Sequence, residues 1–198
     1  MIKVSVQNHQ QAQNEIREAL RKFGTDKSVT VGIHEDDNAR PDGDLTNASL
    51  GAIHHFGADI DHPGGTSYGY ASQSDAEQGK VKFLKKGAGF MVLGETGPHK
   101  IGIPARPWLD VGVAQGNQEY INLIKDVIGD GGTLEKALEQ IGTAAVGFTQ
   151  EYMSDLKSPP NSKSTVAKKG FNNPLVNSGE LRQSVSYKVV NKLPDEGL

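Results

Sequence analysis

The chain has 198 residues, a formal net charge of −3 and no cysteine. Its length suits one domain, or one domain that carries a large insertion. The absence of cysteine excludes disulfide bonds, thiolate metal sites and a cysteine nucleophile. The slightly acidic balance excludes a global basic field that would hold nucleic acid. No signal peptide and no membrane-spanning helix are expected, because the start of the chain lacks a basic and an apolar region and no apolar run approaches ~18 residues.

The first third of the chain predicts a strand, a helix and a second strand. Residues 1–6 alternate apolar and polar side chains, which is typical of a strand. Residues 9–23 place their apolar side chains on one stripe, as an amphipathic helix does. Residues 28–34 alternate again, and this second strand should present Val29, Val31 and Ile33 on one face.

A polar loop at residues 35–44 should lead to a short helix that ends at Phe56. Thr46 or Asn47 can cap its start, and Gly57 can stop it in a left-handed conformation. The expected apolar face of this helix consists of Ala48, Ala52, Ile53 and Phe56.

The middle of the chain predicts an inserted, β-rich lobe at residues 58–100. Residues 59–79 show no helical period and should form an exposed excursion, and residues 80–86 and 89–95 should form a β-hairpin. Residues 101–107 should be extended, because residues that precede proline avoid the helical region.

The C-terminal half predicts mostly helix. Residues 117–128 should form a helix with Tyr120, Ile121, Ile124 and Ile128 inward, and Thr133 should cap the longest helix, which runs to about Leu156. The expected inner stripe of the longest helix is Leu134, Leu138, Ile141, Ala145, Phe148 and Tyr152. Residues 157–174 should be a loop, a turn should start at Asn177 or Ser178, and a closing strand should span residues 185–190. These elements predict an α+β fold in which a small, mainly antiparallel sheet is packed by the long helix.

The most enzyme-like stretch lies between His54 and His62. A metal-dependent hydrolase that uses His54, His55, Asp59 and His62 is an alternative, because imidazoles and carboxylates are metal ligands. The spacing argues against it, since adjacent helical residues point roughly 100° apart and a helical two-histidine site needs the i, i+4 spacing. No G-x-S-x-G elbow exists, and the glycine-rich stretch 64–69 lacks the lysine of a phosphate-binding loop. We therefore expect no catalytic, cofactor-binding or metal-binding residue and no enzyme.

The loop at residues 157–174 is basic. It carries Lys157, Lys163, Lys168 and Lys169 and no acidic residue, so it can contact DNA phosphates or an acidic patch on a partner. A DNA-binding module and a plain solvated loop both remain open. Arg106 and Trp108 are further candidate contacts, and Trp108 is expected to be a core or interface anchor presented by an extended stretch.

Two pairs of segments carry a resemblance to a known family. The first pair is residues 47–57 (NASLGAIHHFG) and 103–109 (IPARPWL), and the second is residues 160–170 (PNSKSTVAKKG) and 174–187 (PLVNSGELRQSVSY). Together they resemble the tail-completion and neck proteins of long-tailed bacteriophages, the family that includes the minor tail protein Z of phage lambda and related virion-morphogenesis proteins. Trp108 stands where that family usually has phenylalanine, and Asn177-Ser178-Gly179 replaces an acidic-Thr-Gly run.

The resemblance implies a single tail-completion-like domain over residues 1–198, with 58–100 as an insertion. It implies a structural virion protein of the neck, assembled in the bacterial cytoplasm, that forms a homo-oligomeric ring and is expected to be a hexamer. The implied partners are the tail tube or tail terminator, the head-closure or connector protein, and genomic DNA in the channel, with no membrane and no cofactor. A tail terminator or a head-closure protein of the same neck is the alternative.

Overall fold

The chain divides into two compact units. Unit 1 consists of residues 1–55 and 106–198, and unit 2 consists of residues 56–105. The computed structural model describes residues 27–37, 39–40, 45–85 and 88–191. The strand predicted at residues 1–6 and the helix predicted at residues 9–23 lie outside the described residues. Unit 2 contains the whole of the insertion predicted at residues 58–100.

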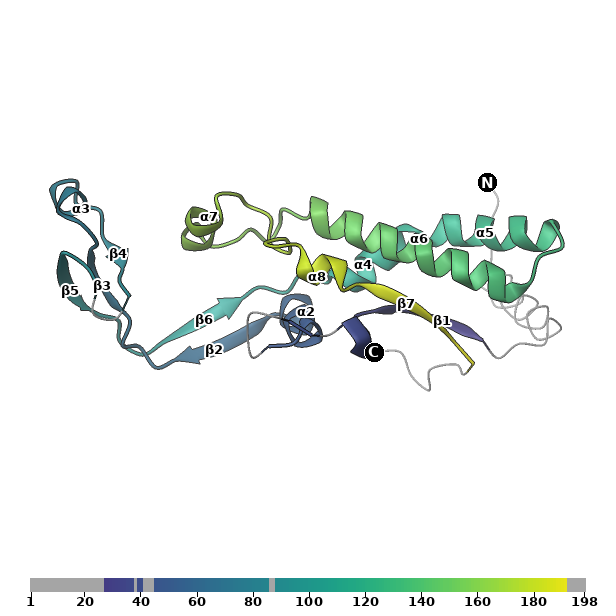
Figure 1. Ribbon diagram of the computed structural model, residues 1–198, viewed down its shortest axis with the longest axis horizontal. Coiled ribbons are helices and arrows are strands. Elements are labelled where there is room, and N and C mark those ends of the chain that lie inside the picture. Colours follow the sequence, from purple (N-terminus) through teal and green to yellow (C-terminus); the bar gives the residue numbers. More distant parts are fainter. Residues whose placement is uncertain (1–26, 38, 41–44, 86–87, 192–198) are drawn as a thin grey trace, which may run out of the picture. The chain divides into compact units, whose positions relative to one another are not determined.

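Unit 1 is built on a two-stranded antiparallel sheet and one long helix. Strands β1 (Ser28–Gly32) and β7 (Ser186–Val190) pair along their whole length, and helix α6 (Leu134–Asp155) lies against both of them (Figure 1). Thr133 caps α6 as predicted, since its hydroxyl accepts a hydrogen bond from the Lys136 backbone N–H at 3.2 Å. The predicted α+β class, with a long helix packed on a small antiparallel sheet, is confirmed.

The described residues of unit 1 form six further helical elements. They are η1 (Glu35–Asp37), α2 (Asn47–Phe56, whose last residue opens unit 2), α4 (Trp108–Gln115), α5 (Asn117–Gly129), α7 (Lys163–Lys169) and α8 (Glu180–Gln183). Helices α4 and α5 both pack on α6. The prediction missed α4 and α7 altogether.

Residues 101–107 were predicted to be extended and to present Trp108, and this prediction is only partly correct. Strand β6 covers only His99–Ile103, and Trp108 is the first residue of α4, with Pro107 at its N-cap. Proline suits the start of a helix, because the first backbone N–H groups have no partner within the helix. The loop predicted at residues 157–174 likewise contains α7, which Ser162 caps through the Thr165 backbone N–H at 3.2 Å.

The core of unit 1 lies where α6, α4 and the C-terminal segment meet. It consists of Trp108, Met153, Leu156, Leu175, Leu181 and Val185. Val31 and Ile33 pack against it from the end of β1, which agrees with their predicted shared face. Ser178 was expected to cap the turn that places Leu181. Instead, Gly179 takes the N-cap position, with a φ of 93° that favours glycine.

Three predicted helix faces are partly wrong. Helix α2 buries Asn47, Gly51 and His55, while Phe56 is 67% exposed. In α5 the buried residue is Val127, and Ile121 is 48% exposed. Helix α6 keeps Leu134, Ile141 and Ala145 of its predicted stripe but also buries Ala137, Gly142, Thr149 and Met153. Each error has one cause: the helix packs against residues distant in sequence, which decide the buried direction.

Unit 2 is made of two small sheets and a short helix. Strands β2 (Ala58–His62) and β6 (His99–Ile103) form an antiparallel ribbon, and β4 (Lys82–Phe83), β3 (Ser67–Tyr70) and β5 (Met91–Glu95) form a three-stranded sheet in the order β4-β3-β5. Helix α3 (Gln73–Glu77) follows β3. Residues 59–79, predicted as an exposed excursion, are largely exposed but form most of β2, all of β3 and helix α3. The strand predicted at residues 80–86 is far shorter, and the hairpin predicted between it and residues 89–95 is wrong, because β4 and β5 each pair with β3.

Gly57 joins α2 to the β2–β6 ribbon. Its φ is 79°, as the prediction of a left-handed stop requires. A Cβ at this position would lie 2.7 Å from the Ile103 carbonyl oxygen, so the close approach of β6 demands glycine as well.

Candidate functional site

Arg106 ties three segments of unit 1 together. Its side chain is 3% exposed, and it donates to the carbonyl oxygens of Pro159 at 2.9 Å and Pro160 at 3.1 Å. A third guanidinium nitrogen lies 3.4 Å from His54 Nδ1, and the Arg106 backbone N–H donates to the His54 carbonyl at 2.8 Å. Arg106 was a candidate partner contact, but burial and these bonds make it the link between α2, α4 and the segment after α6.

His54 is held neutral by this arrangement. Burial, followed by the charges of Arg106 and Lys169, lowers its pKa from 6.5 to about 4. A guanidinium can only donate, so Nδ1 of His54 acts as the acceptor of this contact. Near neutral pH the uncharged His54 ring therefore lies beside the positive charges of Arg106 and Lys169 without adding a third.

Trp108 is a core anchor rather than a surface contact. It is 3% exposed, and its indole N–H donates to the Gly51 carbonyl at 3.0 Å. A Cβ on Gly51 would lie 3.1 Å from the Trp108 ring and 3.0 Å from Ile33. The glycine in the middle of α2 therefore lets the indole lie against the helix backbone.

The C-terminal motif segment folds against the same place. Asn173 donates from its side chain to the Ser154 carbonyl, and its side-chain oxygen accepts the backbone N–H groups of Leu175 and Val176, both at 3.2 Å. A cavity of about 190 Å³ lies between this segment, Leu50 and His54. The motif segments of the resemblance thus come together in unit 1, in positions that fix backbone geometry.

The four residues of the hydrolase alternative all have contacts within their own unit. In unit 1, His55 is 9% exposed, its Nε2 lies 3.3 Å from Asp110 Oδ2 and its ring meets that of Trp108 edge-on. In unit 2, His62 stacks on His99 with ring centroids 4.8 Å apart, and Asp59 pairs in register with Gly102. Within the described residues, no group of three or more His, Cys, Asp or Glu side chains is arranged to hold a metal ion.

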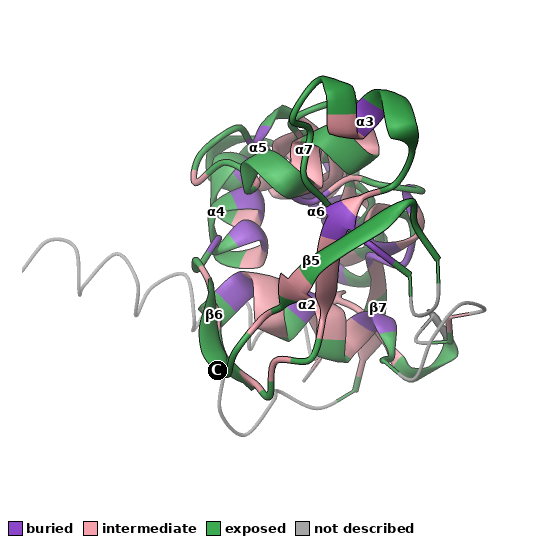
Figure 2. Ribbon diagram, turned by 90° about the vertical axis from the view of Figure 1, so that its left-hand side faces the viewer, coloured by how far each residue is buried: buried purple, intermediate pink, exposed green. Residues whose placement is uncertain are grey.

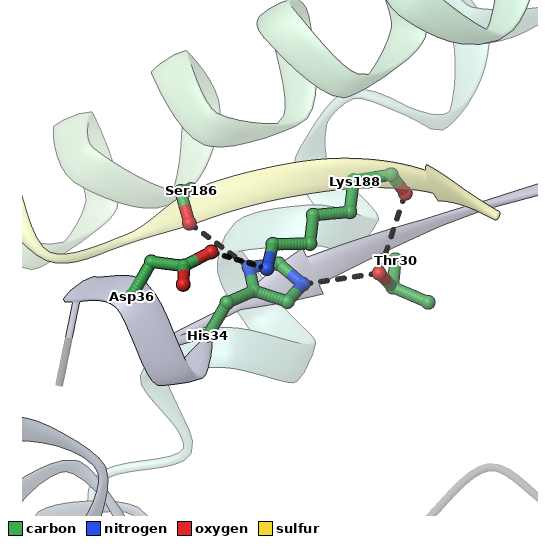
Figure 3. A network of polar contacts seen from close by, with 5 residues as sticks. All are labelled: Thr30, His34, Asp36, Ser186 and Lys188. Carbon is green, nitrogen blue, oxygen red and sulfur yellow. Dashed lines mark hydrogen bonds and ion pairs between the residues drawn. The ribbon is translucent and has the colours of Figure 1, made fainter.

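A serine–histidine contact lies on the β1–β7 sheet, and the sequence analysis did not single it out. His34 Nδ1 is 2.9 Å from Ser186 Oγ, and its Nε2 is 3.0 Å from Thr30 Oγ1 (Figure 3). Lys188 donates to Asp36 at 2.6 Å, which lowers the pKa of that carboxyl. In a catalytic triad the histidine bridges serine and a carboxylate. Here it bridges two hydroxyls from paired strands, an arrangement that fastens η1 to the sheet.

The basic loop has three exposed lysines and one half-buried lysine, and Lys157 among the exposed ones donates to the Ser154 carbonyl at 3.2 Å. Lys157, Lys163 and Lys168 are exposed. Lys169 donates to the carbonyl oxygens of Asn173 at 2.6 Å and Val176 at 2.5 Å. Burial, together with the charge of Arg106, lowers the pKa of Lys169. The first three lysines can therefore meet a partner or DNA, whereas Lys169 holds the loop in place.

Helices α5 and α6 border an open groove on unit 1. The groove has a volume of about 400 Å³, and Leu123, Ala144 and the Tyr187 ring give it apolar walls. Tyr187 reaches it by crossing Gly142, where a Cβ would lie 2.2 Å from the ring, and it donates to Glu139 at 2.8 Å. The groove forms only in the folded protein, because Tyr187 of β7 lies far along the sequence from the two helices that form the other walls.

Unit 2 exposes most of its large apolar side chains. It holds nine of the thirteen exposed large hydrophobic residues in the described chain, and strand β5 is drawn largely exposed in Figure 2. The nine are Phe56, Ile60, Val81, Phe83, Phe90, Met91, Val92, Leu93 and Ile101. Large exposed apolar patches mark interaction surfaces in stable proteins. The sequence analysis missed this surface, although the four consecutive apolar residues at 90–93 put apolar groups on both faces of one strand.

Comparison with protein-family models, with curated proteins and with solved structures finds no match to this chain. No helix in the described ranges is long and apolar enough to cross a bilayer. The function proposed below is therefore supported by the residues and the geometry of this protein alone.

Proposed function

We propose that the protein is a structural subunit of the neck of a long-tailed bacteriophage, where it completes the tail and joins it to the head connector as one member of a homo-oligomeric ring. The observation that carries this proposal is the exposed apolar surface of unit 2. Among its described residues only Leu84 is a buried hydrophobic side chain, at 9% exposure. A lobe that leaves its apolar residues in water is best explained by a protein partner that covers them.

The motif residues support a role in assembly rather than in bond-making. Arg106, Trp108 and Leu181 are all less than 10% exposed, and each holds backbone segments or fills the core. Gly57 and Gly179 adopt positive φ at the ends of helical segments. The segments that resemble the phage family therefore build the rigid body of unit 1, on which surfaces for partners are displayed.

The partners proposed are further copies of the chain, the tail tube or tail terminator, and the head-closure or connector protein. A ring of six copies remains the expectation from the resemblance, with the virion as its location and the bacterial cytoplasm as the place of assembly. A tail terminator or head-closure protein of the same neck would use the same surfaces and is the alternative.

The test is the composition of phage particles. Particles are produced from a strain that carries the gene, purified on a density gradient and digested for mass spectrometry, with the empty tails and heads as separate fractions. We expect a few copies of the protein per particle in tail-bearing fractions. Its absence from intact, tail-bearing particles would contradict the proposal.

Contact with DNA in the channel is supported by Lys157, Lys163 and Lys168, which are exposed on and around α7. Filter binding of the purified protein to duplex DNA across salt concentrations tests it, because phosphate contacts make affinity fall steeply with salt. Replacing these lysines with glutamine should lower both the affinity and its salt dependence. A signal that is absent, or that ignores salt, removes DNA from the list of partners.

A further inference from the structure

The three-stranded sheet of unit 2 has one open aromatic face. In the register of the sheet, Tyr68 of β3 lies opposite Phe83 of β4, and Tyr70 lies opposite Met91 of β5. Directly paired residues point to the same side of a sheet, and alternate residues of one strand share a face. Tyr68, Tyr70, Phe83 and Met91 therefore form one surface, which we call the aromatic face; Phe83 is 67% and Met91 is 48% exposed on it.

The opposite face of this sheet is partly covered by α3. Lys82 precedes Phe83 on β4 and so points away from the aromatic face. Its ammonium group contacts Asp75 of α3 at 2.7 Å, which places α3 on that opposite side. Leu84, also out of phase with Phe83, is the apolar residue that is buried. The buried Leu84 thus lies on the same side as α3, although Val92 of β5 on that side is 60% exposed, and Phe83 and Met91 are exposed on the aromatic face.

Unit 1 offers a surface of matching character. The groove between α5 and α6 has a volume of about 400 Å³ and apolar walls at Leu123, Ala144 and Tyr187. Its rim carries Glu119, Glu139 and Lys136. A groove of this size accepts aromatic side chains, which are the anchors that dominate most protein interfaces.

The charges of the two surfaces are complementary. The segment 80–93, which holds Phe83 and Met91, contains four lysines and no acidic residue, and one of these lysines, Lys82, is paired with Asp75 on the opposite side of the sheet. The segment 108–157, which forms α4, α5 and α6, contains eight acidic residues against three lysines. Opposite charges around an apolar contact steer the encounter and fix its register.

We propose that the aromatic face of one copy docks in the α5–α6 groove of the next copy. Because the two surfaces differ, the contact is head-to-tail, and repetition of such a contact closes into a ring when the rotation permits. The inference rests on the proposed ring and names the surfaces through which neighbouring copies meet. Exposed Lys80 and Lys85, which flank Phe83 in the sequence, then lie near the acidic helices of the neighbour.

The absence of native cysteine allows a direct test by cross-linking between copies. Two proteins are made, one with Val81→Cys, an exposed residue two positions before Phe83, and one with Lys136→Cys at the rim of the groove, and they are mixed and treated with a short bismaleimide. We expect a covalent dimer from the mixture and little from either protein alone. The control replaces Lys136→Cys with Lys125→Cys, which is exposed on α5 but does not line the groove. Equal yields with the control would overturn the inference.

A second measurement reports on the assembly itself. Phe83→Ser combined with Met91→Ser should convert the oligomer to a monomer in light scattering after size exclusion, with at least a tenfold weaker self-association. Its urea midpoint for unit 1 should stay unchanged, since neither residue belongs to the core of that unit. A matched variant, Val111→Ser, removes an exposed apolar residue outside both surfaces and should leave the oligomer intact.

The outcomes separate this contact from the neck assignment. Rings that persist in the double variant overturn the aromatic-face contact, while the protein's presence in particles still supports the neck. A wild-type protein that stays monomeric at high concentration and sediments with anionic lipid vesicles assigns the face to a membrane and also overturns the contact. Absence from particles, tested separately, counts against the neck role itself.

Discussion

Units 1 and 2 differ in how far they bury their large apolar side chains. Unit 1 packs its large apolar side chains around Trp108, Met153 and α6, whereas unit 2 exposes nine of them and buries Leu84. Both units have ordinary strands and helices, so the difference lies in tertiary packing and not in local structure. Unit 1 therefore has an apolar core of its own, while unit 2 presents an apolar surface that, in the proposed function, a partner covers. Matched substitutions in the two units test this difference.

The largest effect is expected from Leu181→Asp. Leu181 is 6% exposed in the core of unit 1, and a buried, unpaired carboxylate should cost more than about 4 kcal/mol. We expect the protein to lose cooperative unfolding in urea. The matched change in unit 2, Leu93→Asp, affects a residue that is 46% exposed and should cost less than about 1 kcal/mol. Similar losses at both positions would erase the contrast.

Trp108→Ala should follow, with a loss of about 3–5 kcal/mol in the free energy of unfolding, because it leaves a large cavity and an unpaired Gly51 carbonyl. Phe83→Ala in unit 2 removes another large aromatic group, but Phe83 is 67% exposed and the change should cost less than about 1 kcal/mol. Urea denaturation followed by circular dichroism measures both values. A small effect at Trp108 would mean that the core of unit 1 is wrongly assigned.

The pH dependence of stability should reveal His54. Its pKa is about 4 when folded and about 6.5 in the unfolded chain, so the unfolded state binds a proton that the folded state does not. Stability is therefore fully present above pH ~6.5 and falls as the pH drops toward 4, by up to about 3 kcal/mol. His54→Gln keeps an acceptor for Arg106 and should flatten this part of the profile. An unchanged slope in that variant would place the titrating group elsewhere.

The smallest effect is expected in the basic loop. Lys169→Met leaves the carbonyl oxygens of Asn173 and Val176 without their donor and should cost about 1–2 kcal/mol. Lys168→Met, one residue away and exposed, should stay within about 0.5 kcal/mol. Thermal or urea unfolding of the two variants gives the comparison. If both variants behave alike, Lys169 is a surface residue like its neighbour.

Local patterns in the sequence predicted the elements that local chemistry decides. Thr133 caps α6, Gly57 ends α2 in a left-handed conformation, and the alternation at residues 28–34 and 185–190 identifies β1 and β7. Helix α4 was missed because Pro104 and Pro107 suggested an extended stretch, although proline also suits the position just before a helix. Helix α7 was missed because a short lysine-rich stretch has no apolar period to detect.

The candidate site was predicted less well than the fold. Arg106 and Trp108 were recognised as notable residues, but their burial depends on Pro159, Pro160 and Gly51, which lie about fifty residues away along the chain. Lys169 could not be separated from Lys168, because only the folded loop brings the carbonyl groups of residues 173 and 176 to it. The aromatic face was not foreseen, because its residues come from three strands that only the folded sheet brings together.

The α+β class, the long capped helix and the helix stop at Gly57 follow from the sequence alone, because they depend on side-chain period and on the backbone preferences of neighbouring residues. The buried face of each helix, the contacts of Lys169 and the exposed apolar groups of unit 2 are instead set by tertiary packing. These properties depend on contacts between segments far apart in the chain, such as Trp108 with Gly51 and Tyr187 with Gly142. No local pattern encodes such contacts, because each partner alone is compatible with several packings.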